Sequence, residues 1–134
     1  MHIAPYLSFN GQCRQAFEFY EKALGGKINY ISTIGESPMA EHTPPEQRDR
    51  IMHVSLQAGD FMILGADAPP QYFSQPQGFS VCISVTDPAE ADRIFNALSP
   101  GGKIQMPIQE TFWAKRFGML VDQFGTPWMV NCGQ

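Results

Sequence analysis

Two periods of hydrophobic residues alternate along the chain, and the changes from one to the other predict its elements. Over Cys13–Leu24, apolar residues recur every three or four positions, which predicts an amphipathic helix. Gly25 and Gly26 mark its end, as a C-terminal glycine cap does. A second helix is predicted over 88–98, because Asp87 can serve as N-cap and Pro88 suits the first helical position.

Shorter runs with a period of two, or with continuous apolar character, surround both helices and predict strands. The predicted strands cover residues 3–9, 27–33, 50–57, 61–64, 79–85, 103–108, 113–121 and 128–131. In the third strand, alternation places Met52, Val54 and Leu56 on one face and Ile51, His53 and Ser55 on the other.

The last two strands are predicted to form a hairpin around the turn 122–127, in which Gly125 can adopt a positive φ. In the last strand, Trp128 and Val130 then point one way, and Met129 and Asn131 the other. If one face is core, the other can line a cleft. The stretch 35–49 has neither period and contains three prolines, so it is predicted to be a loop.

The two halves of the chain repeat the same order of strand, helix and three strands. Their helices end alike, in ALGGKI and ALSPGGKI, and Phe61-Met62-Ile63 matches Trp128-Met129-Val130 in the last strands. This predicts an α+β fold of two tandem βαβββ modules, whose curved mixed sheets surround a cleft. Module one covers about residues 1–66, a linker about 67–78 and module two about 79–134, together forming a single domain.

Composition excludes several classes of function. The net charge is −4 and no run of Lys or Arg is present, which argues against nucleic-acid and membrane-surface partners. The three cysteines are widely spaced, so we expect reduced, buried or half-buried thiols and no disulfide framework or zinc finger. No secretion signal or membrane-spanning run is visible, and we expect a cytoplasmic protein.

Five segments carry a resemblance to a known family: PYLSFNG at 5–11, AFEFY at 16–20, IMH at 51–53, QETFWA at 109–114 and DQFGTPWM at 122–129. With them, nearly the whole chain resembles the vicinal oxygen chelate superfamily of glyoxalase I, extradiol dioxygenases, and fosfomycin- and bleomycin-resistance proteins. More narrowly, it resembles the PhnB-like branch, sometimes labelled a 3-demethylubiquinone methyltransferase domain. The resemblance implies paired βαβββ modules, a homodimer and a small-molecule cleft.

The superfamily's enzymes hold a divalent metal through His and Glu on the first and last strand of each module. Those positions fall here near Pro5, at Ile63 or Leu64, at Phe79 or Ser80, and at Met129. None of these is a usual ligand of a hard metal ion. We therefore expect no metal cofactor at the standard position, and no standard metal mechanism. The methyltransferase label is not matched by any glycine-rich nucleotide-binding turn.

The cleft candidates are His53, Ser55, Glu110, Trp113 and Met129. His53 can be a base, a hydrogen-bond donor to a ligand, a ligand of a displaced metal together with Glu110, or a structural histidine. Glu110 can be an acid or base beside aromatic residues, or a solvated loop carboxylate.

Four methionines occupy strand positions. Met52, Met62, Met119 and Met129 can line an adaptable apolar pocket, or fill the core, which is the interpretation we favour.

Three hypotheses follow. The first is a metal-free PhnB-like protein that binds a small organic ligand, with undefined activity. The second is a metal-dependent lyase- or dioxygenase-type enzyme with a rearranged site built from His53 and Glu110. The third is a drug-sequestering binder like the bleomycin-resistance proteins, which hold a basic ligand in an acidic groove.

Overall fold

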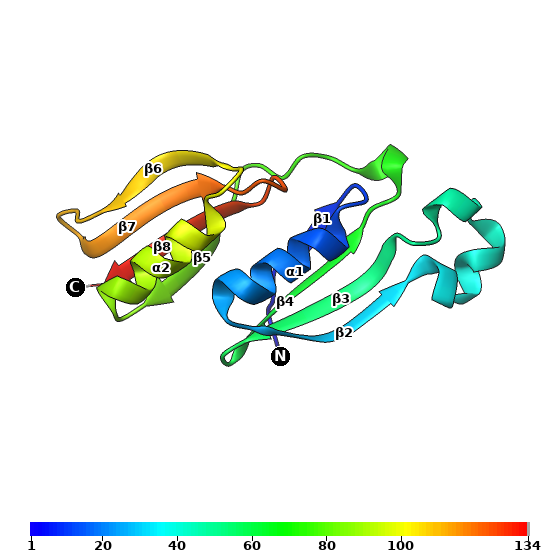
Figure 1. Ribbon diagram of the computed structural model, residues 1–134, viewed down its shortest axis with the longest axis horizontal. Helices are drawn as coiled ribbons and strands as arrows, with labels where there is room; N and C mark the ends of the chain where they lie inside the picture. The colour runs from blue at the N-terminus through cyan, green and yellow to red at the C-terminus, as the bar shows by residue number, and fades with distance from the viewer. Residues whose placement is uncertain (134) are drawn as a thin grey trace. The chain divides into compact units, whose positions relative to one another are not determined.

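A computed structural model describes residues 1–133, and the chain divides into two compact units, Met1–Ser74 and a second from Gln75 onward. The first unit contains β1 (Tyr6–Phe9), α1 (Cys13–Leu24), β2 (Lys27–Thr33), β3 (Ile51–Ala58) and β4 (Phe61–Asp67) (Figure 1). The second contains β5 (Val81–Val85), α2 (Pro88–Leu98), β6 (Lys103–Gln109), β7 (Ala114–Val121) and β8 (Pro127–Gly133). The repeated βαβββ order confirms the α+β fold and the tandem modules. That the two units form one domain stays a prediction.

Each unit folds into one mixed sheet of four strands with a helix on one face. The strand orders are β1-β4-β3-β2 and β5-β8-β7-β6. In both sheets the strand before the helix pairs in parallel with the last strand of the unit, and the other pairs are antiparallel. The helix carries the chain across the sheet, and three consecutive antiparallel strands then lead back to the first one.

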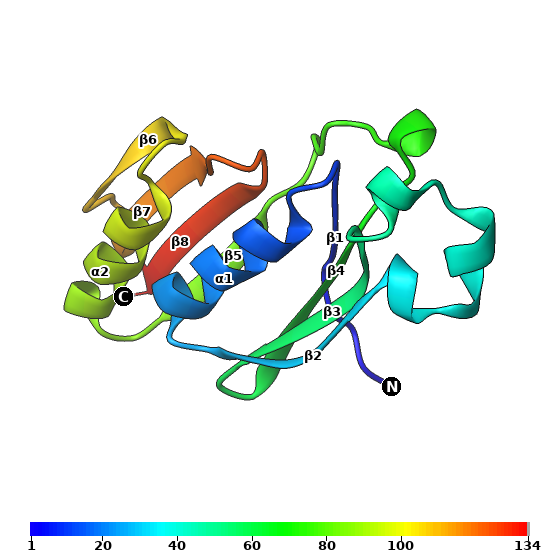
Figure 2. The ribbon, with the colours of Figure 1, turned by 45° about the vertical axis from the view of Figure 1, so that its right-hand side comes forward.

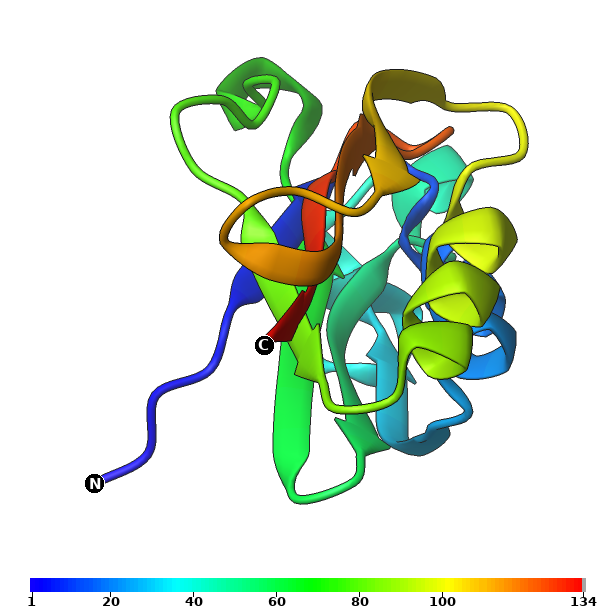
Figure 3. The ribbon, with the colours of Figure 1, turned by 90° about the vertical axis from the view of Figure 1, so that its left-hand side faces the viewer.

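Both predicted helices have the bounds that the sequence indicated, while several segments between strands differ. The first strand begins at Tyr6 and not at residue 3, and the exposed residues before it extend away from the sheet (Figure 3). The predicted loop contains 3₁₀ turns at Ile34–Glu36, Pro38–His42 and Pro45–Gln47, which project beyond the ends of β2 and β3 (Figure 2). In the predicted linker, β4 continues to Asp67 and Pro70–Tyr72 forms a further 3₁₀ turn.

The core of the first unit lies between α1 and its sheet. The helix buries residues at the predicted helical spacing, namely Cys13, Ala16, Phe17, Tyr20 and Ala23. The sheet contributes Leu7, Phe9, Val54 and Leu56, all buried. The ring of Phe17 lies directly over Gly65, where an added Cβ would come within 2.6 Å of Phe17 Cε1. Glycine at this position therefore sets how closely the helix approaches the sheet.

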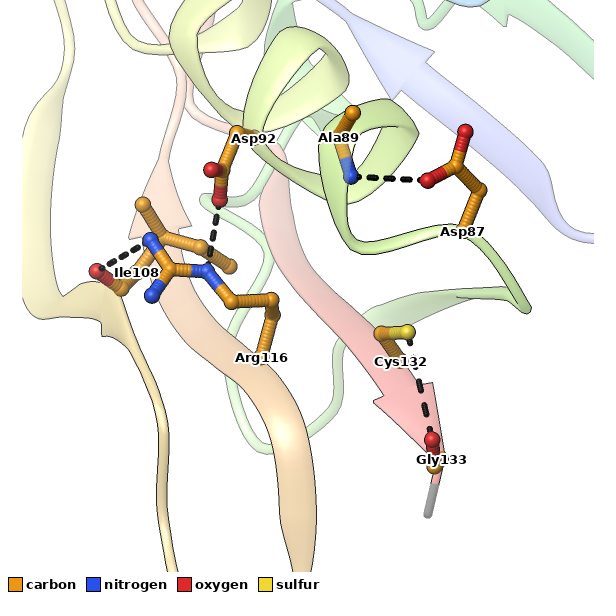
Figure 4. A network of polar contacts seen from close by, with 7 residues as sticks. All are labelled: Asp87, Ala89, Asp92, Ile108, Arg116, Cys132 and Gly133. Carbon is orange, nitrogen blue, oxygen red and sulfur yellow. Dashed lines mark hydrogen bonds and ion pairs between the residues drawn. The ribbon is translucent and has the colours of Figure 1, made fainter.

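The second unit repeats this packing and adds polar contacts between helix and sheet. Phe95 of α2 lies over Gly118 of β7, where an added Cβ would come within 2.7 Å of Phe95 Cε2. As predicted, Asp87 caps α2, accepting a hydrogen bond from the Ala89 amide (Figure 4). Arg116 of β7 forms a 2.7 Å ion pair with Asp92 of α2, which joins the helix to the sheet (Figure 4).

A buried carboxylate joins three segments of the first unit. Oδ1 of Asp67 accepts hydrogen bonds from the amides of Gly11 and Cys13, at 2.8 and 3.1 Å. Its Oδ2 accepts one from the amide of Ile51, at 2.8 Å. Because Gln12, the N-cap of α1, makes no side-chain cap hydrogen bond, Asp67 from the end of β4 supplies the acceptor at this helix start.

Asp122 plays a comparable part in the turn between β7 and β8. Its Oδ1 accepts hydrogen bonds from the amides of Phe124 and Thr126, and its Oδ2 accepts one from Trp128 Nε1 at 2.8 Å. Gly125 has a φ of 94°, as the predicted turn required. The carboxylate fixes both the turn and the indole of the fully buried Trp128.

The predicted faces of the third strand are wrong at its start. His53 pairs with Ser32 and Ile51 pairs with Thr33, so Met52 is an extra residue at a register shift. The shift turns Ile51 to the core, with Val54 and Leu56, and leaves Met52 exposed.

The structure also shifts the predicted match between the last strands of the two modules by two residues. A Cβ added at Gly26 would meet the carbonyl of Gln57, and a Cβ added at Gly102 would meet the carbonyl of Val121. Gln57 of the first unit therefore corresponds to Val121 of the second. Leu56, which precedes Gln57, pairs with Ile63, and Leu120, which precedes Val121, pairs with Trp128. Ile63 therefore corresponds to Trp128, in place of the predicted Phe61, which is 78% exposed. A slip of two preserves the faces of a strand, so the assignment of Trp128 and Val130 to the core is unaffected.

Neither α-helix within residues 1–133 combines the length and apolar composition that crossing a membrane requires.

Removing the charge of Asp67 tests its role in the first unit. We expect Asp67→Asn to lower the free energy of unfolding by about 2–3 kcal/mol. The side-chain NH₂ of asparagine would face one of the backbone N–H groups that donate to the carboxylate, and that N–H would lose its acceptor. Urea unfolding followed by circular dichroism measures this. The matched control is Asp60→Asn in the exposed β3–β4 turn, and equal midpoints for the two variants would contradict the expectation.

The contact between α2 and its sheet can be tested in the same way. We expect Gly118→Ala to destabilise the protein by about 1–3 kcal/mol, because the methyl group overlaps the ring of Phe95. Gly133→Ala is the control, since nothing lies within 4 Å of the Cβ built there. Thermal unfolding of both variants compares them, and a Gly118→Ala variant as stable as the control would show that the helix shifts freely.

Candidate functional site

Each sheet has one face that its own helix does not cover, and strand alternation decides which side chains stand there. We call these the first and second open faces. Alternate residues of the four strands in the first unit form the first open face: Tyr6, Ser8, Tyr30, Ser32, His53, Ser55, Gln57, Met62, Leu64 and Ala66. Their neighbours along the strands, such as Leu7, Val54 and Ile63, are buried on the helix side.

Two tyrosines flank His53 on the first open face. Tyr6 Oη lies 3.2 Å from His53 Nδ1, and the two ring centroids are 5.8 Å apart. Tyr30 lies on the other side, with its ring centroid 6.1 Å from that of His53. Both tyrosines are about half exposed, at 51% and 57%. The three rings therefore form an accessible aromatic surface around one imidazole.

The Tyr6 hydroxyl is suited to donate to the imidazole. Partial burial raises the pKa of Tyr6, with a smaller contribution from the nearby Cys13, so the phenol stays protonated around neutral pH. A phenol that donates to Nδ1 leaves the proton of a neutral imidazole on Nε2. His53 then offers one further N–H donor.

The predicted pair His53 and Ser55 does share a face. Ser55 is buried and lies in one cross-strand row with Tyr30, Leu64 and Tyr6. His53 is half-buried in the next row, opposite Ser32. The register shift at Met52 does not change this, because Met52 and Ser55 lie on opposite sides of His53 along the strand.

The second open face is formed mainly by sulfur-containing and aromatic side chains. One cross-strand row contains Cys82, Met129, Met119 and Met106, each from a different strand. The next row contains Ser84, Asn131 and Phe117. Trp128, Val130 and Leu120 alternate with these residues and are fully buried on the side of α2.

Trp113, the aromatic candidate of the second unit, lies at the edge of this face. Trp113 packs edge-on against Phe117, with ring centroids 5.5 Å apart, and against Phe112 at 4.7 Å. Trp113 is 46% exposed and Phe112 is 92% exposed, so neither aromatic side chain is part of the core. Glu110 is exposed and directly follows β6.

The positions of the methionines contradict the expectation that they fill the core. Met52 and Met62 are exposed, while Met119 and Met129 are half-buried on the second open face. None of the four fills the core, and Met129 remains a candidate for ligand contact. Cys13 and Cys132 are buried, as expected for reduced thiols, but Cys82 is exposed.

The residues of the open faces do not fit the hard divalent metal of the superfamily. Register places Tyr6 opposite Leu64 and Cys82 opposite Met129, on the first and last strands of the two units. A phenol, an aliphatic chain, a thiol and a thioether do not match the His and Glu ligands of that site. Asp67 is the only carboxylate in the eight strands, and it is buried and bonded to three backbone amides.

The rearranged metal site of His53 and Glu110 gains no support within either of the described units. His53 belongs to the first sheet, and Glu110 to the end of β6 in the second unit. Among residues 1–133, no three His, Cys, Asp or Glu side chains come together as metal ligands.

Sequence reasoning missed Tyr30, Cys82 and Met106. Tyr30 follows a register shift in β2, where Ile28 pairs with Leu56 and Tyr30 with Ser55, so simple alternation does not place it. Cys82 and Met106 lie on edge strands of the second sheet. Cys82 lies between Val81 and Ile83, but Met106 lies between Gln105 and Pro107, so local alternation gives no signal for Met106. Only the pairing register shows that they share a row with Met119 and Met129.

Comparisons with known proteins agree with this fold. The sequence profile of the 3-demethylubiquinone-9 3-methyltransferase family matches residues 1–131. Protein YjdN of Escherichia coli K12 is 36% identical over 98% of this chain and 95% of its own length. The crystal structure of protein PA1353 from Pseudomonas aeruginosa is 45% identical, with a TM-score of 0.91 over 100% of this chain and 98% of that one.

A more distant structure shares the fold alone. The bleomycin-binding protein of Streptomyces verticillus, solved with copper(II)-bleomycin, superposes with a TM-score of 0.63 at 18% identity, over 100% of this chain and 97% of that one. The resemblance seen in the sequence is thereby confirmed for the family and for the fold. The chain belongs to the 3-demethylubiquinone-9 3-methyltransferase family, and it has the fold expected from its resemblance to the vicinal oxygen chelate superfamily.

Proposed function

We propose that the first open face binds a small, uncharged, planar organic molecule that carries a carbonyl-type hydrogen-bond acceptor. The observation that carries this proposal is the arrangement of Tyr6 and Tyr30 on either side of His53, with Tyr6 Oη 3.2 Å from Nδ1. Two half-exposed rings offer stacking surfaces to a flat ligand. An imidazole that accepts from Tyr6 keeps an N–H for the ligand's acceptor.

The charge of the face supports an uncharged ligand over a basic one. The strand residues of the first open face include no carboxylate, and Asp67 lies on the other side of the sheet. A cationic ligand would find no counter-charge there, and burying an unpaired charge is costly. This disfavours an acidic drug-binding groove on this face, although the fold is shared with the bleomycin-binding protein.

The family's description names methyl transfer, but the sheets lend it no support. Both are mixed, with a helix on one face, and neither is the doubly wound parallel sheet at whose strand ends nucleotide cofactors bind. The proposal therefore rests on the first open face. The homodimer and the cytoplasmic location stay predictions.

The proposal predicts which compounds bind and which variants lose them. A thermal-shift screen would compare planar aromatic ketones, lactams and quinones with matched analogues that lack the carbonyl, and with aromatic amines. We expect stabilisation by the carbonyl compounds. For the best of them, His53→Ala should weaken binding by roughly 3- to 10-fold in calorimetry, the contribution of one hydrogen bond, and Tyr30→Ala by a similar factor.

Tyr72→Ala provides the matched control, since Tyr72 is exposed and lies outside the sheet. If His53→Ala and Tyr30→Ala bind as well as Tyr72→Ala, the first open face is not the binding site. Stabilisation by aromatic amines alone would favour the drug-sequestering alternative.

The metal-enzyme alternative predicts a different result. We expect the purified, untagged protein to take up no stoichiometric zinc, nickel, manganese or iron(II) through His53, because no His or carboxylate accompanies it on its face. Elemental analysis after incubation and desalting measures this, with His53→Ala and Glu110→Gln in parallel. One equivalent of metal in the parent protein that both variants lose would establish the rearranged site.

A further inference from the structure

The second open face carries sulfur atoms from all four strands of its sheet. Cys82 of β5 pairs with Met129 of β8, Met129 with Met119 of β7, and Met119 with Met106 of β6. Adjacent strands lie about 4.8 Å apart, and side chains directly opposite one another have Cβ atoms about 4.5–5.5 Å apart. One thiol and three thioethers therefore stand side by side in a single row.

Burial shows that this row points away from the core. Val130, Trp128 and Leu120 alternate with these residues and are fully buried, whereas the three methionines are half-buried and Cys82 is exposed. The Cys82 sulfur lies 3.9 Å from Ser84 Oγ, two residues along the same face of β5. The sulfurs are thus accessible, unlike those of Cys13 and Cys132.

Such a donor set selects a soft ion. Thiolate and thioether sulfur favour copper(I) over the hard divalent ions that carboxylates and carbonyls bind. Methionine has three rotatable bonds, so neighbouring thioethers can turn toward a common point. A thiolate with a monovalent cation also forms a neutral unit, which suits a face whose strand residues include no carboxylate.

We propose that the second open face binds a soft monovalent d¹⁰ cation, such as copper(I) or silver(I), through Cys82, Met129 and Met119. The site differs from a hard-metal site in its donor atoms, which are sulfur in place of nitrogen and oxygen. Met106 lies next in the row and can replace one of the thioethers. Phe117, in the next row, and Trp113, which packs on Phe117, border the site on one side. The proposal concerns the second unit alone, so it stands or falls separately from the ligand proposed for the first.

Titration of the reduced protein with copper(I) under anaerobic conditions, against a chromophoric copper(I) chelator, tests the site. We expect one equivalent bound, loss of that equivalent in Cys82→Ser, and at least about tenfold weaker binding in Met129→Leu and in Met119→Leu. Leucine keeps the apolar volume, so folding is preserved while the sulfur is lost. X-ray absorption of the loaded protein should show a coordination shell of three sulfurs, and zinc should not compete at equal concentration.

Met62→Leu is the matched control, because Met62 is an exposed strand methionine of the first unit. Binding that survives in Cys82→Ser would place the ion elsewhere and overturn the proposal. Binding lost in Cys82→Ser but unchanged in both methionine variants would also overturn it, since copper would then be held by a single exposed thiol. Circular dichroism of each variant confirms that folding is intact.

Discussion

The structure depends on one constraint: each four-stranded sheet has a single helix, so only one of its faces is covered by its own unit. Strand alternation then divides every strand into residues that meet the helix and residues that do not. The first set is closely packed, to the point that a Cβ added at Gly65 or Gly118 would come within 2.6 or 2.7 Å of the ring of Phe17 or Phe95. The second set is relieved of core packing, and the two candidate sites are built from it.

Two buried aspartates hold the ends of this arrangement in place. Asp67 bonds the β1–α1 turn and the start of β3, while Asp122 bonds the β7–β8 turn and the indole of Trp128. Both meet backbone or indole N–H donors, which compensates the cost of burying a carboxylate. Their positions fix the register of the strands beside them. Register in turn decides that Tyr6 meets His53 in one sheet and that Cys82 meets Met129 in the other.

The sequence alone predicts elements well, because helical spacing and strand alternation are local. The bounds of both helices, the glycine cap at Gly25 and the N-cap at Asp87 all follow from a few neighbouring residues. What local patterns do not contain is which strands pair, and with what shifts. The bulge at Met52 reversed the face of Ile51, and a two-residue slip misaligned Phe61 with Trp128. The site residues that sequence analysis missed, such as Tyr30 and Cys82, can be recognised only from their cross-strand partners.

The two repeated units have the same fold but carry open faces with different side-chain chemistry. Corresponding rows contain Tyr6, Leu64, Ser55 and Tyr30 in the first unit, and Cys82, Met129, Met119 and Met106 in the second. His53 corresponds to Phe117, so the imidazole of one face is a plain aromatic ring in the other. The first face offers hydroxyls, an imidazole and rings, which suit hydrogen bonding and stacking, whereas the second offers polarizable sulfur. Since each core packs on the opposite side of its sheet, the two faces could diverge in chemistry without changing the fold that carries them.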